Sequence, residues 1–492
     1  MKRDRRILLA LIFGILVFYL WSLAPSVLWG DDAFFQRSAF DGTLPRDGGG
    51  HWLWFVLARA IVQVPLGEVA YRVNLLSGLA AVATIGLLYA AGRSLNLSRV
   101  AAAAAALSLS VAHTFWMHAV RAEVYTVFTA LLVLELILMF QWTQDRFWPL
   151  PVALGLFGLT LLGHQMAVLL LPAIGWLMLR QVRWLSPGRI ALALGAFLAG
   201  LIPAVFVIHQ QIAAVDAVQS FVLYFTHSGR DFGVSMFDFG LGQLPRDTAL
   251  WFGFLGLQFP SPALIAGVLG LASIRRWIAD VRWQMLTVLY LTDTAFAFSY
   301  RVNDFYVFYL PSYVAFALFI GLGWDSLIQS RRRLAAPLVQ IGLIAAIVVL
   351  PPLAYFGLAS TFESLGLNPL SIRELPGREP NRYFLWPGKA GYFGALDYGM
   401  RLLSNLPPNS VLVADYTPYQ TLLYLQTVEQ MRPDVRMVPI GAAGDLGDVV
   451  RAIPEQSRVF LADNDLRYYG WQDLTDFSLR PMDLGYELTR SP

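Results

Sequence analysis

Long apolar runs fill the chain up to residue 358 and restrict its fold more than any other feature. A membrane-spanning helix needs about 20 mostly apolar residues. Hydrophobic residues make up 57% of the 492 positions and charged residues only 14%, whereas soluble domains carry about a quarter charged residues. The runs therefore predict an all-α polytopic membrane protein with about eleven transmembrane helices. Their approximate bounds are residues 7–28, 69–92, 98–113, 121–142, 147–163, 165–180, 190–209, 247–273, 284–300, 305–324 and 335–358.

Basic residues cluster in every second turn between these runs. Because cytoplasmic loops carry an excess of lysine and arginine, we expect these turns and the N-terminus to be cytoplasmic, in a plasma-membrane protein. An odd number of spans then puts the residues after 358 on the extracytoplasmic side. The basic positions are Lys2, Arg3, Arg5, Arg6, Arg93, Arg99, Arg146, Arg180, Arg183, Arg189, Arg275, Arg276, Arg282, Arg331, Arg332 and Arg333.

Titratable side chains collect in the turns of the opposite face. Ionisable groups at membrane depth are costly unless they line a cavity or a pathway. Their concentration on one face predicts a single outward-facing site, although polar loops alone would also produce it. The group consists of His51, His113, His118, His164, His209, His227, Asp31, Asp32, Glu123, Asp231 and Asp304.

The composition changes after residue 358. We predict a transmembrane domain at 1–358, with a long first extracytoplasmic loop at 29–68, and a small extracytoplasmic α/β domain at 359–492. The latter contains no glycine-rich phosphate loop, which argues against nucleotide binding. The arginines sit in short loops, so nucleic acid is not an expected partner. Predicted elements are strands at 410–415, 435–440 and 457–463 and a helix at 418–431.

Two adjacent carboxylates, Asp31 and Asp32, follow the first apolar run. Carboxylates this close repel each other, so one of the two tends to have a raised pKa. Such a group can accept a proton from an attacking sugar hydroxyl. We therefore predict a catalytic role for the pair; the alternative is two solvated charges that cap a loop.

The segment HTFWMHAVRAEVY, residues 113–125, is dense in charged and aromatic side chains. If it is helical, its spacing forms two stripes, His113 with Glu123, and His118 with Arg121 and Tyr125. The planar guanidinium of Arg121 suits a phosphate, so we predict substrate-binding roles here. A charge cluster that merely tethers loops is the alternative.

Weaker substrate-binding candidates lie in three other turns. His51 opens a predicted amphipathic surface helix at 51–64, His164 stands in GHQ, and Arg301 and Asp304 belong to YRVND. A simple helix start explains His51 equally well, and a helix cap or an interfacial ion pair is the favoured explanation for His164, Arg301 and Asp304. The chain has no cysteine, which excludes disulfides and thiolate metal sites. No cofactor is certain, and a divalent metal is left open.

Four segments in order along the chain resemble the DUF2723 family of GT-C glycosyltransferases, whose eukaryotic member is the transmembrane O-mannosyltransferase related to TMEM260. They are GEVAYRVNLLSGLAAVATIGLLY, FWMHAVRAEVYTVFTALLVLEL, GHQ and LLYLQTVEQMRPDV. The likeness extends from about residue 25 to about residue 440. It implies that a sugar is taken from a polyprenyl-phosphate lipid on the non-cytoplasmic side, with an aspartate of the first outer loop as base or acceptor ligand.

The first loop departs from the family pattern Asp-Ser-Gly-Glu-Phe. In DDAFF, residues 31–35, Asp31 matches the family aspartate, Asp32 takes the serine position and Phe34 replaces the glutamate. The family's His-Pro-Pro-Gly becomes HWLW, which keeps His51, whereas Glu123, Tyr125 and His164 match directly. By resemblance, the changed loop implies a different acceptor, and either aspartate remains a candidate base.

The residues and the family resemblance together predict a membrane glycosyltransferase that moves mannose or a similar sugar to an acceptor hydroxyl, with inversion, in the assembly of the cell envelope. Its partners would be a polyprenyl-phosphate sugar donor, a protein, glycan or lipid acceptor, and membrane lipid. The alternatives are a transporter or lipid flippase, which often shows internal repeats, and a non-catalytic envelope assembly protein.

The absence of native cysteine allows a direct test of the single outward-facing site. Single cysteines at positions 31, 51, 123 and 164 should all react with a membrane-impermeant thiol reagent added from the extracytoplasmic side. A cysteine at position 93 or 276 should react only from the cytoplasmic side. Labelling of the first four from both sides would contradict the predicted topology.

Overall fold

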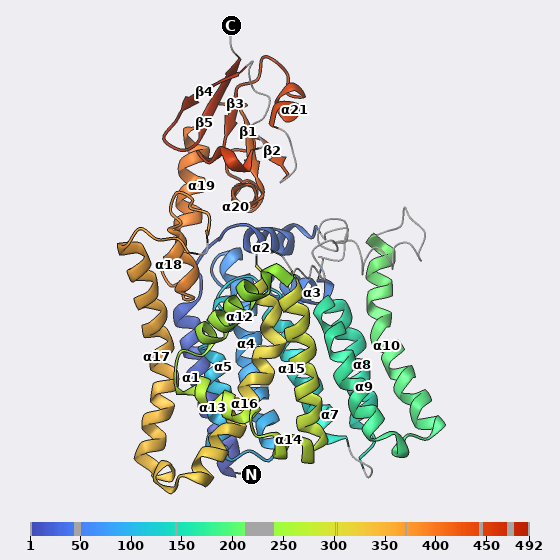
Figure 1. The fold of residues 1–492 in the computed structure, drawn as a ribbon. Coiled ribbons are helices and arrows are strands. Elements are labelled where there is room, and N and C mark those ends of the chain that lie inside the picture. The colour runs from blue at the N-terminus through green and yellow to red at the C-terminus, as the bar shows by residue number, and fades with distance from the viewer. Residues whose placement is uncertain are drawn as a thin grey trace.

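The computed structural model describes residues 2–43, 51–142, 146–211, 241–300, 302, 304–369, 371–441, 446–469 and 477–490. Figure 1 shows a bundle of helices with a small sheet beyond one end, which we call the upper end; the N-terminus lies at the lower end. The chain thus combines an all-α polytopic membrane bundle with a small α/β region, and the predicted fold class is confirmed.

Every predicted span coincides with a helix or a helix pair. Four helices are long and apolar enough to cross a membrane, and α5 with α6, bent by 67°, forms a fifth such unit among the described residues. Several others are shorter, so the number of crossings stays a prediction. The helices are α1 (Lys2–Ser22), α4 (Val69–Ser94), α5 (Arg99–Ser110), α6 (His113–Ala119), α7 (Tyr125–Gln141), α8 (Pro149–Gly163), η2 (Gln165–Leu170), α9 (Leu171–Arg180), α10 (Pro187–Gln211), α12 (Leu244–Gln258), α13 (Pro262–Leu271), α14 (Ile274–Ala279), α15 (Val281–Ser299), η7 (Phe305–Tyr309), α16 (Leu310–Ser330) and α17 (Pro337–Ser364).

Basic turns meet at the lower end of the bundle, beside the start of α1. Arg93, at the end of α4, places Nε 2.9 Å from the Asp4 carboxylate, and Arg99, at the start of α5, places Nη2 3.1 Å from it. Arg282, at the start of α15, donates from Nη1 to the Ser94 carbonyl at 2.6 Å. Which side of a membrane this end faces stays a prediction.

Two helical stretches are interrupted. Segment 113–125 is not one continuous helix, so the stripes that such a helix would form do not extend across it, because α6 ends at Ala119 and α7 begins at Tyr125. In the gap, the Glu123 N–H and carbonyl both bond the Ser77 hydroxyl on α4, at 3.1 and 3.0 Å, which replaces helical hydrogen bonds. The predicted span 247–273 is split between α12 and α13 at a turn that contains two prolines, Pro260 and Pro262.

Two acids lie inside the bundle, apart from the turns that the sequence singled out. Glu135 on α7 accepts a hydrogen bond from the Thr160 hydroxyl on α8 at 2.5 Å. Asp293 on α15 accepts from the Ser312 N–H, in the first turn of α16, at 2.8 Å. Both side chains are buried, and each ties one helix to its neighbour. The titratable groups are therefore concentrated at one face without being confined to it.

The first long loop forms two helices that lie across the upper end, α2 (Asp31–Asp41) and α3 (Trp52–Val62) (Figure 1). Trp54 and Phe55 of α3 are buried, as is Phe35 of α2. They join one hydrophobic cluster with Leu422 and Leu425 of the C-terminal region. The two helices thus bury one side between the bundle and the C-terminal region, while Val56 and Leu57 of α3 stay exposed.

The C-terminal region folds around a five-stranded sheet of order β2-β1-β3-β5-β4. Strand β1 pairs in parallel with β2 and β3, whereas β5 runs antiparallel to β3 and β4. The predicted strands and helix within 410–463 are confirmed, and the β4–β5 hairpin was not foreseen. A division at residue 358 stays a prediction. The elements are α18 (Pro380–Leu385), α19 (Gly394–Asn405), β1 (Val411–Asp415), α20 (Tyr416–Thr427), β2 (Arg436–Ile440), α21 (Leu446–Arg451), β3 (Val459–Leu461), η9 (Leu466–Tyr468), β4 (Phe477–Pro481) and β5 (Tyr486–Arg490).

Glycines bring α13 and α16 into backbone contact. A Cβ atom at Gly270 would overlap the Phe319 carbonyl, and one at Gly323 would overlap the Ala266 carbonyl. Small residues allow membrane helices to approach this closely. We expect G323A to lower the apparent melting temperature in detergent, because overpacking costs about 1–3 kcal/mol. The matched control G342A, on α17 with open space around it, should not be destabilised; equal melting of all three proteins would contradict the contact.

Candidate functional site

The two predicted catalytic carboxylates stand in the first turn of α2, after a sharp bend. Gly30 has φ of +58°, a left-handed conformation that favours glycine. Acidic residues are also favoured in the first turn of a helix, near the positive end of its dipole. After the bend the two carboxylates have different surroundings: Asp32 is only 2% exposed and lies toward the interior, whereas Asp31 is exposed. We call the exposed side of the site, at Asp31, its entrance.

Arg121, in the gap between α6 and α7, is the cation of the site. Its Nε lies 3.7 Å from Asp32 Oδ1, and its Nη2 donates to Glu123 Oε1 at 3.0 Å. Nη2 also lies 3.5 Å from His118 Nδ1. Within the described part of the chain, Asp32 Oδ1 and Arg121 Nε have no hydrogen-bond partner. The cluster therefore holds a buried acceptor and a buried donor that a substrate group could satisfy.

Burial sets the electrostatics of this cluster. It raises the pKa of Asp32 to about 6; the Arg121 charge opposes the shift and the Asp31 charge adds to it. Burial also raises the pKa of Glu123 well above its usual range, and the Arg121 charge again opposes this shift. A carboxyl group with a pKa near 6 is mostly ionised at neutral pH and can still take up a proton, which suits a general base.

The C-terminal region supplies two cations that sequence reasoning missed. Lys389 is 3% exposed, and its Nζ donates to the carbonyls of Tyr383 and Trp386 at 2.9 and 2.8 Å. Burial lowers the pKa of Lys389 to about 7. The guanidinium of Arg378 lies 4.7 Å from the centre of the Tyr383 ring. Both cations oppose the raised pKa of Asp32. The only local signal was a lysine within the turn-forming sequence WPGKAGY.

A third missed residue contacts the exposed aspartate. The Tyr416 hydroxyl, at the start of α20, donates to Asp31 Oδ1 at 2.5 Å. The two residues are 385 positions apart, and no local pattern links them. The acid pair is thus bounded by Arg121 on the bundle side and by the C-terminal region on the other.

The predicted histidines form a row of aromatic rings. His51 and His164 stack with centroids 4.8 Å apart, Tyr125 follows at 5.2 Å from His164, and His118 at 4.9 Å from Tyr125. His164 Nδ1 accepts from the Met166 N–H at 3.1 Å. The row joins α3 and the end of α8 to the Arg121 cluster, so the structure brings these four predicted residues together.

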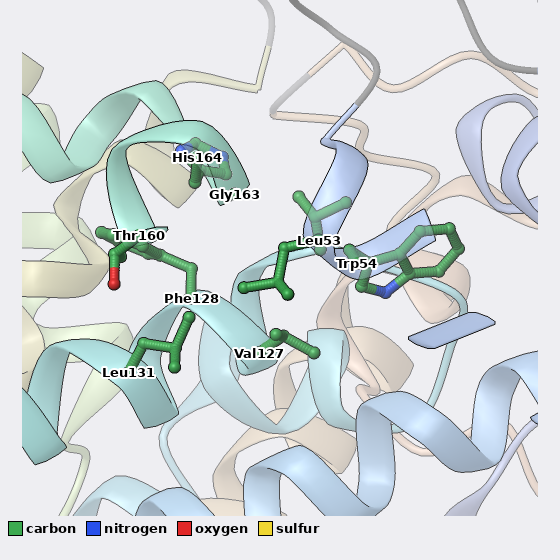
Figure 2. A pocket seen from close by; sticks show the side chains of 9 residues that line it. Leu53, Trp54, Val127, Phe128, Leu131, Thr160, Gly163 and His164 are labelled. Atoms are coloured by element: carbon green, nitrogen blue, oxygen red, sulfur yellow. The ribbon is translucent and has the colours of Figure 1, made fainter. Parts of the chain in front are cut away.

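A narrow recess of about 10 Å³ lies beside His164. Figure 2 shows His164, Gly163 and Thr160 on one side of it and Leu53 and Trp54 on the other. Its walls are mostly apolar, so the recess is not itself a phosphate site.

A larger hollow, about 340 Å³, lies between α12, α15 and η7. Its lining combines aromatic side chains with the charged residues Arg246 and Asp247, and Phe305 in its lining follows Asp304 directly in the chain. The lining residues are Arg246, Asp247, Leu250, Ala297, Phe298, Tyr300, Val302, Phe305 and Tyr309.

Three other predicted residues are Asp304, Arg301 and His113. Asp304 is exposed, and its charge adds to the raised pKa of Glu123. Arg301 lies outside the described residues. His113, on the same predicted stripe as Glu123, turns away, and its Nε2 lies 2.8 Å from the Phe384 carbonyl. No group of three or more His, Asp or Glu side chains suited to a metal ion is found in the portion of the chain that the structure describes.

Comparison with known proteins identifies the family segment and the fold. Residues 48–186 match the model of the protein O-mannosyl-transferase TMEM260 N-terminal domain. The predicted resemblance is thereby confirmed over a range that contains His51, Arg121 and His164 and lacks the Asp31–Asp32 pair. No curated protein sequence matches the chain.

Two membrane glycosyltransferases share the fold. ArnT from Cupriavidus metallidurans, bound to undecaprenyl phosphate, superposes with a TM-score of 0.58 and 14% identity, covering 98% of this chain and 97% of that one. The Archaeoglobus fulgidus oligosaccharyltransferase, in complex with zinc and sulfate, gives 0.53 and 13% over 89% of this chain and 63% of that one. The chain has a GT-C-like fold, and together with the family segment this supports the predicted glycosyltransferase class.

Replacement of Arg121 tests the cluster. R121Q leaves two buried carboxylates without their cation, and breaking a buried pair costs about 3–5 kcal/mol. Because burial already raises the pKa values of Asp32 and Glu123, and loss of the cation raises them further, ionisation should weaken folding as pH increases. We expect R121Q to lower the apparent melting temperature more at pH 8 than at pH 5.5.

The control is R401Q, which breaks an exposed ion pair between Arg401 Nη2 and Asp483 Oδ2 at 2.7 Å. Exposed pairs contribute about 0–1 kcal/mol, so its effect should be small at both pH values. A pH-independent loss in R121Q would contradict the role assigned to the arginine.

Proposed function

We propose that this protein is a GT-C glycosyltransferase that moves a sugar from a polyprenyl-phosphate donor to an acceptor hydroxyl on the non-cytoplasmic face. The observation that carries the proposal is the buried Asp32–Arg121–Glu123 cluster, which adjoins the exposed Asp31 at the upper end of a GT-C-like bundle. The N-terminus is then cytoplasmic and the C-terminal region extracytoplasmic, in the plasma membrane.

The acid pair provides the base. An acceptor hydroxyl near Asp31 gives its proton to a carboxylate of the pair as its oxygen attacks the anomeric carbon. The bond from that carbon to the phosphate oxygen breaks in the same step, so the configuration inverts. The pKa of Asp32, near 6, keeps it mostly ionised at neutral pH. Asp31, being exposed, would orient the acceptor.

The leaving group is a lipid phosphate, which needs positive charge more than it needs a proton. Arg121 offers a buried Nε that has no hydrogen-bond partner among the described residues. Arg378 and Lys389 add positive charge from the C-terminal region. Phe298, Phe305 and Tyr309 give one side of the hollow an aromatic surface that suits a prenyl chain. The undecaprenyl phosphate bound to the similarly folded ArnT supports a donor of this class.

The family segment favours mannose as the sugar, since the matching model describes an O-mannosyl-transferase domain. A protein hydroxyl is the corresponding acceptor, and a glycan or lipid hydroxyl is the alternative. The row of aromatic rings would hold the sugar and the phosphate of the donor against Arg121. This gives a substrate-binding role to His51, His118, Tyr125 and His164.

Substitution of each aspartate tests this mechanism in purified protein supplied with radiolabelled polyprenyl-phosphate mannose and a serine-containing peptide. General-base catalysis is worth about 10²–10⁴-fold, so D32N should lower kcat by that factor and D31N should lower both kcat and acceptor affinity. Both variants should elute from size exclusion as the wild type does.

The matched control is D41N, because Asp41 ends the same helix at an exposed position and pairs with Arg37. It should transfer sugar normally. Full activity in D31N and D32N alike would reject the acid pair as catalytic. Movement of the lipid across vesicles without any sugar transfer would instead favour the flippase alternative.

A further inference from the structure

We propose that the C-terminal region completes the active site, with Tyr416 as a positioning residue that fixes the Asp31 carboxylate at the entrance. This inference rests on the proposed function and deepens it, because it assigns a catalytic purpose to a region that the family match does not cover. The first turn of α20 is the part of the region that makes the contact.

Three hydrogen bonds join this turn to residues 28–31. The Tyr416 hydroxyl donates to Asp31 Oδ1 at 2.5 Å, and the Gly30 N–H donates to the Thr417 carbonyl at 3.2 Å. The Thr421 hydroxyl donates to the Leu28 carbonyl at 2.9 Å. The bend that presents the acid pair is therefore anchored to α20 from its backbone as well as from its side chain.

The contact is suited to hold an exposed carboxylate. A phenol that donates to an ionised carboxylate makes a short, charge-assisted hydrogen bond. Burial and the nearby Asp31 charge raise the pKa of Tyr416 well above its usual range, so the hydroxyl keeps its proton and remains a donor. Tyr416 has few rotamers, and Asp31 would otherwise sample several in solvent. The bond therefore selects one orientation of the carboxylate.

The sheet fixes the position of Tyr416. Asp415, the last residue of β1, caps α20 through its Oδ2, which accepts from the Thr417 N–H at 3.3 Å. Arg373 donates to Asp415 Oδ2 at 2.6 Å and to Asp463 Oδ2 at 2.7 Å. Asp463 follows β3, the parallel neighbour of β1, so the guanidinium bridges the carboxyl ends of two adjacent strands.

Arg373 belongs to the segment between α17 and α18, and its guanidinium also lies 3.6 Å from the centre of the Tyr468 ring. Its donors are mostly buried with the two aspartates. The connection therefore runs from the last long helix of the bundle through Arg373 and Asp415 to Tyr416 and Asp31. A displaced sheet would move the hydroxyl away from the carboxylate.

The test compares Y416F with Y419F in the full-length protein. Tyr419 lies on the same helix, and its hydroxyl makes no hydrogen bond with the described part of the chain. We expect Y416F to lower kcat about 10–100-fold with a smaller change in donor KM, and Y419F to behave as wild type. The pH profile of kcat/KM, measured for all three proteins, should differ from that of the wild type only in Y416F.

Hydrogen exchange of the backbone amides at 31–36 gives a readout that does not need turnover. These amides should exchange faster in Y416F than in the wild type and Y419F. If the wild type transfers sugar and Y416F matches it in rate and pH profile, the inference is overturned and the proposed function stands. If the wild type transfers no sugar, the proposed function fails, and unchanged exchange in Y416F would then overturn the anchoring as well.

Discussion

The interaction on which the site depends is the placement of one guanidinium, that of Arg121, between two buried carboxylates. Asp32 and Glu123 come from elements that are far apart in the chain, and neither could stay ionised at such low exposure without a cation. The helix is interrupted between α6 and α7, at the segment that carries Arg121 and Glu123 into the interior. The Ser77 hydroxyl bonds the N–H and the carbonyl of Glu123, which have no helical partner there. The interruption thus coincides with the charged residues of the site.

The site has two sides that are made differently. The bundle contributes one wall, where the rings of His51, His164, Tyr125 and His118 contact one another in a row at the ends of α3, α6, α7 and α8. The C-terminal region contributes cations on short segments, with Lys389 held by the carbonyls at the end of α18. A basic residue is favoured at that end of a helix, so the same lysine stabilises α18 and carries positive charge to the acid pair.

Much of the fold could be predicted from the sequence, because lipid imposes long apolar runs and the basic turns report their order. Three strands of the C-terminal sheet were also visible as short apolar runs, whereas the β4–β5 hairpin was not. What escaped prediction depends on tertiary contact: the break after Ala119 requires Ser77, and the close approach of α13 and α16 requires Gly270 and Gly323. In the site, the local density of charged residues indicated Asp32, Arg121 and Glu123. No local sequence pattern indicated that Tyr416, Arg378 and Lys389 belong to the same site.

The order of the chain adds a consequence to the contact between α20 and the loop at 28–31. The ribosome makes the acid pair first and its tyrosine partner nearly four hundred residues later. A nascent chain that has inserted every apolar helix still lacks Tyr416 and the sheet that holds it. Under the proposed function, competence for sugar transfer is thus a property of the finished polypeptide, and a truncated product that reaches the membrane would lack the contact that positions Asp31.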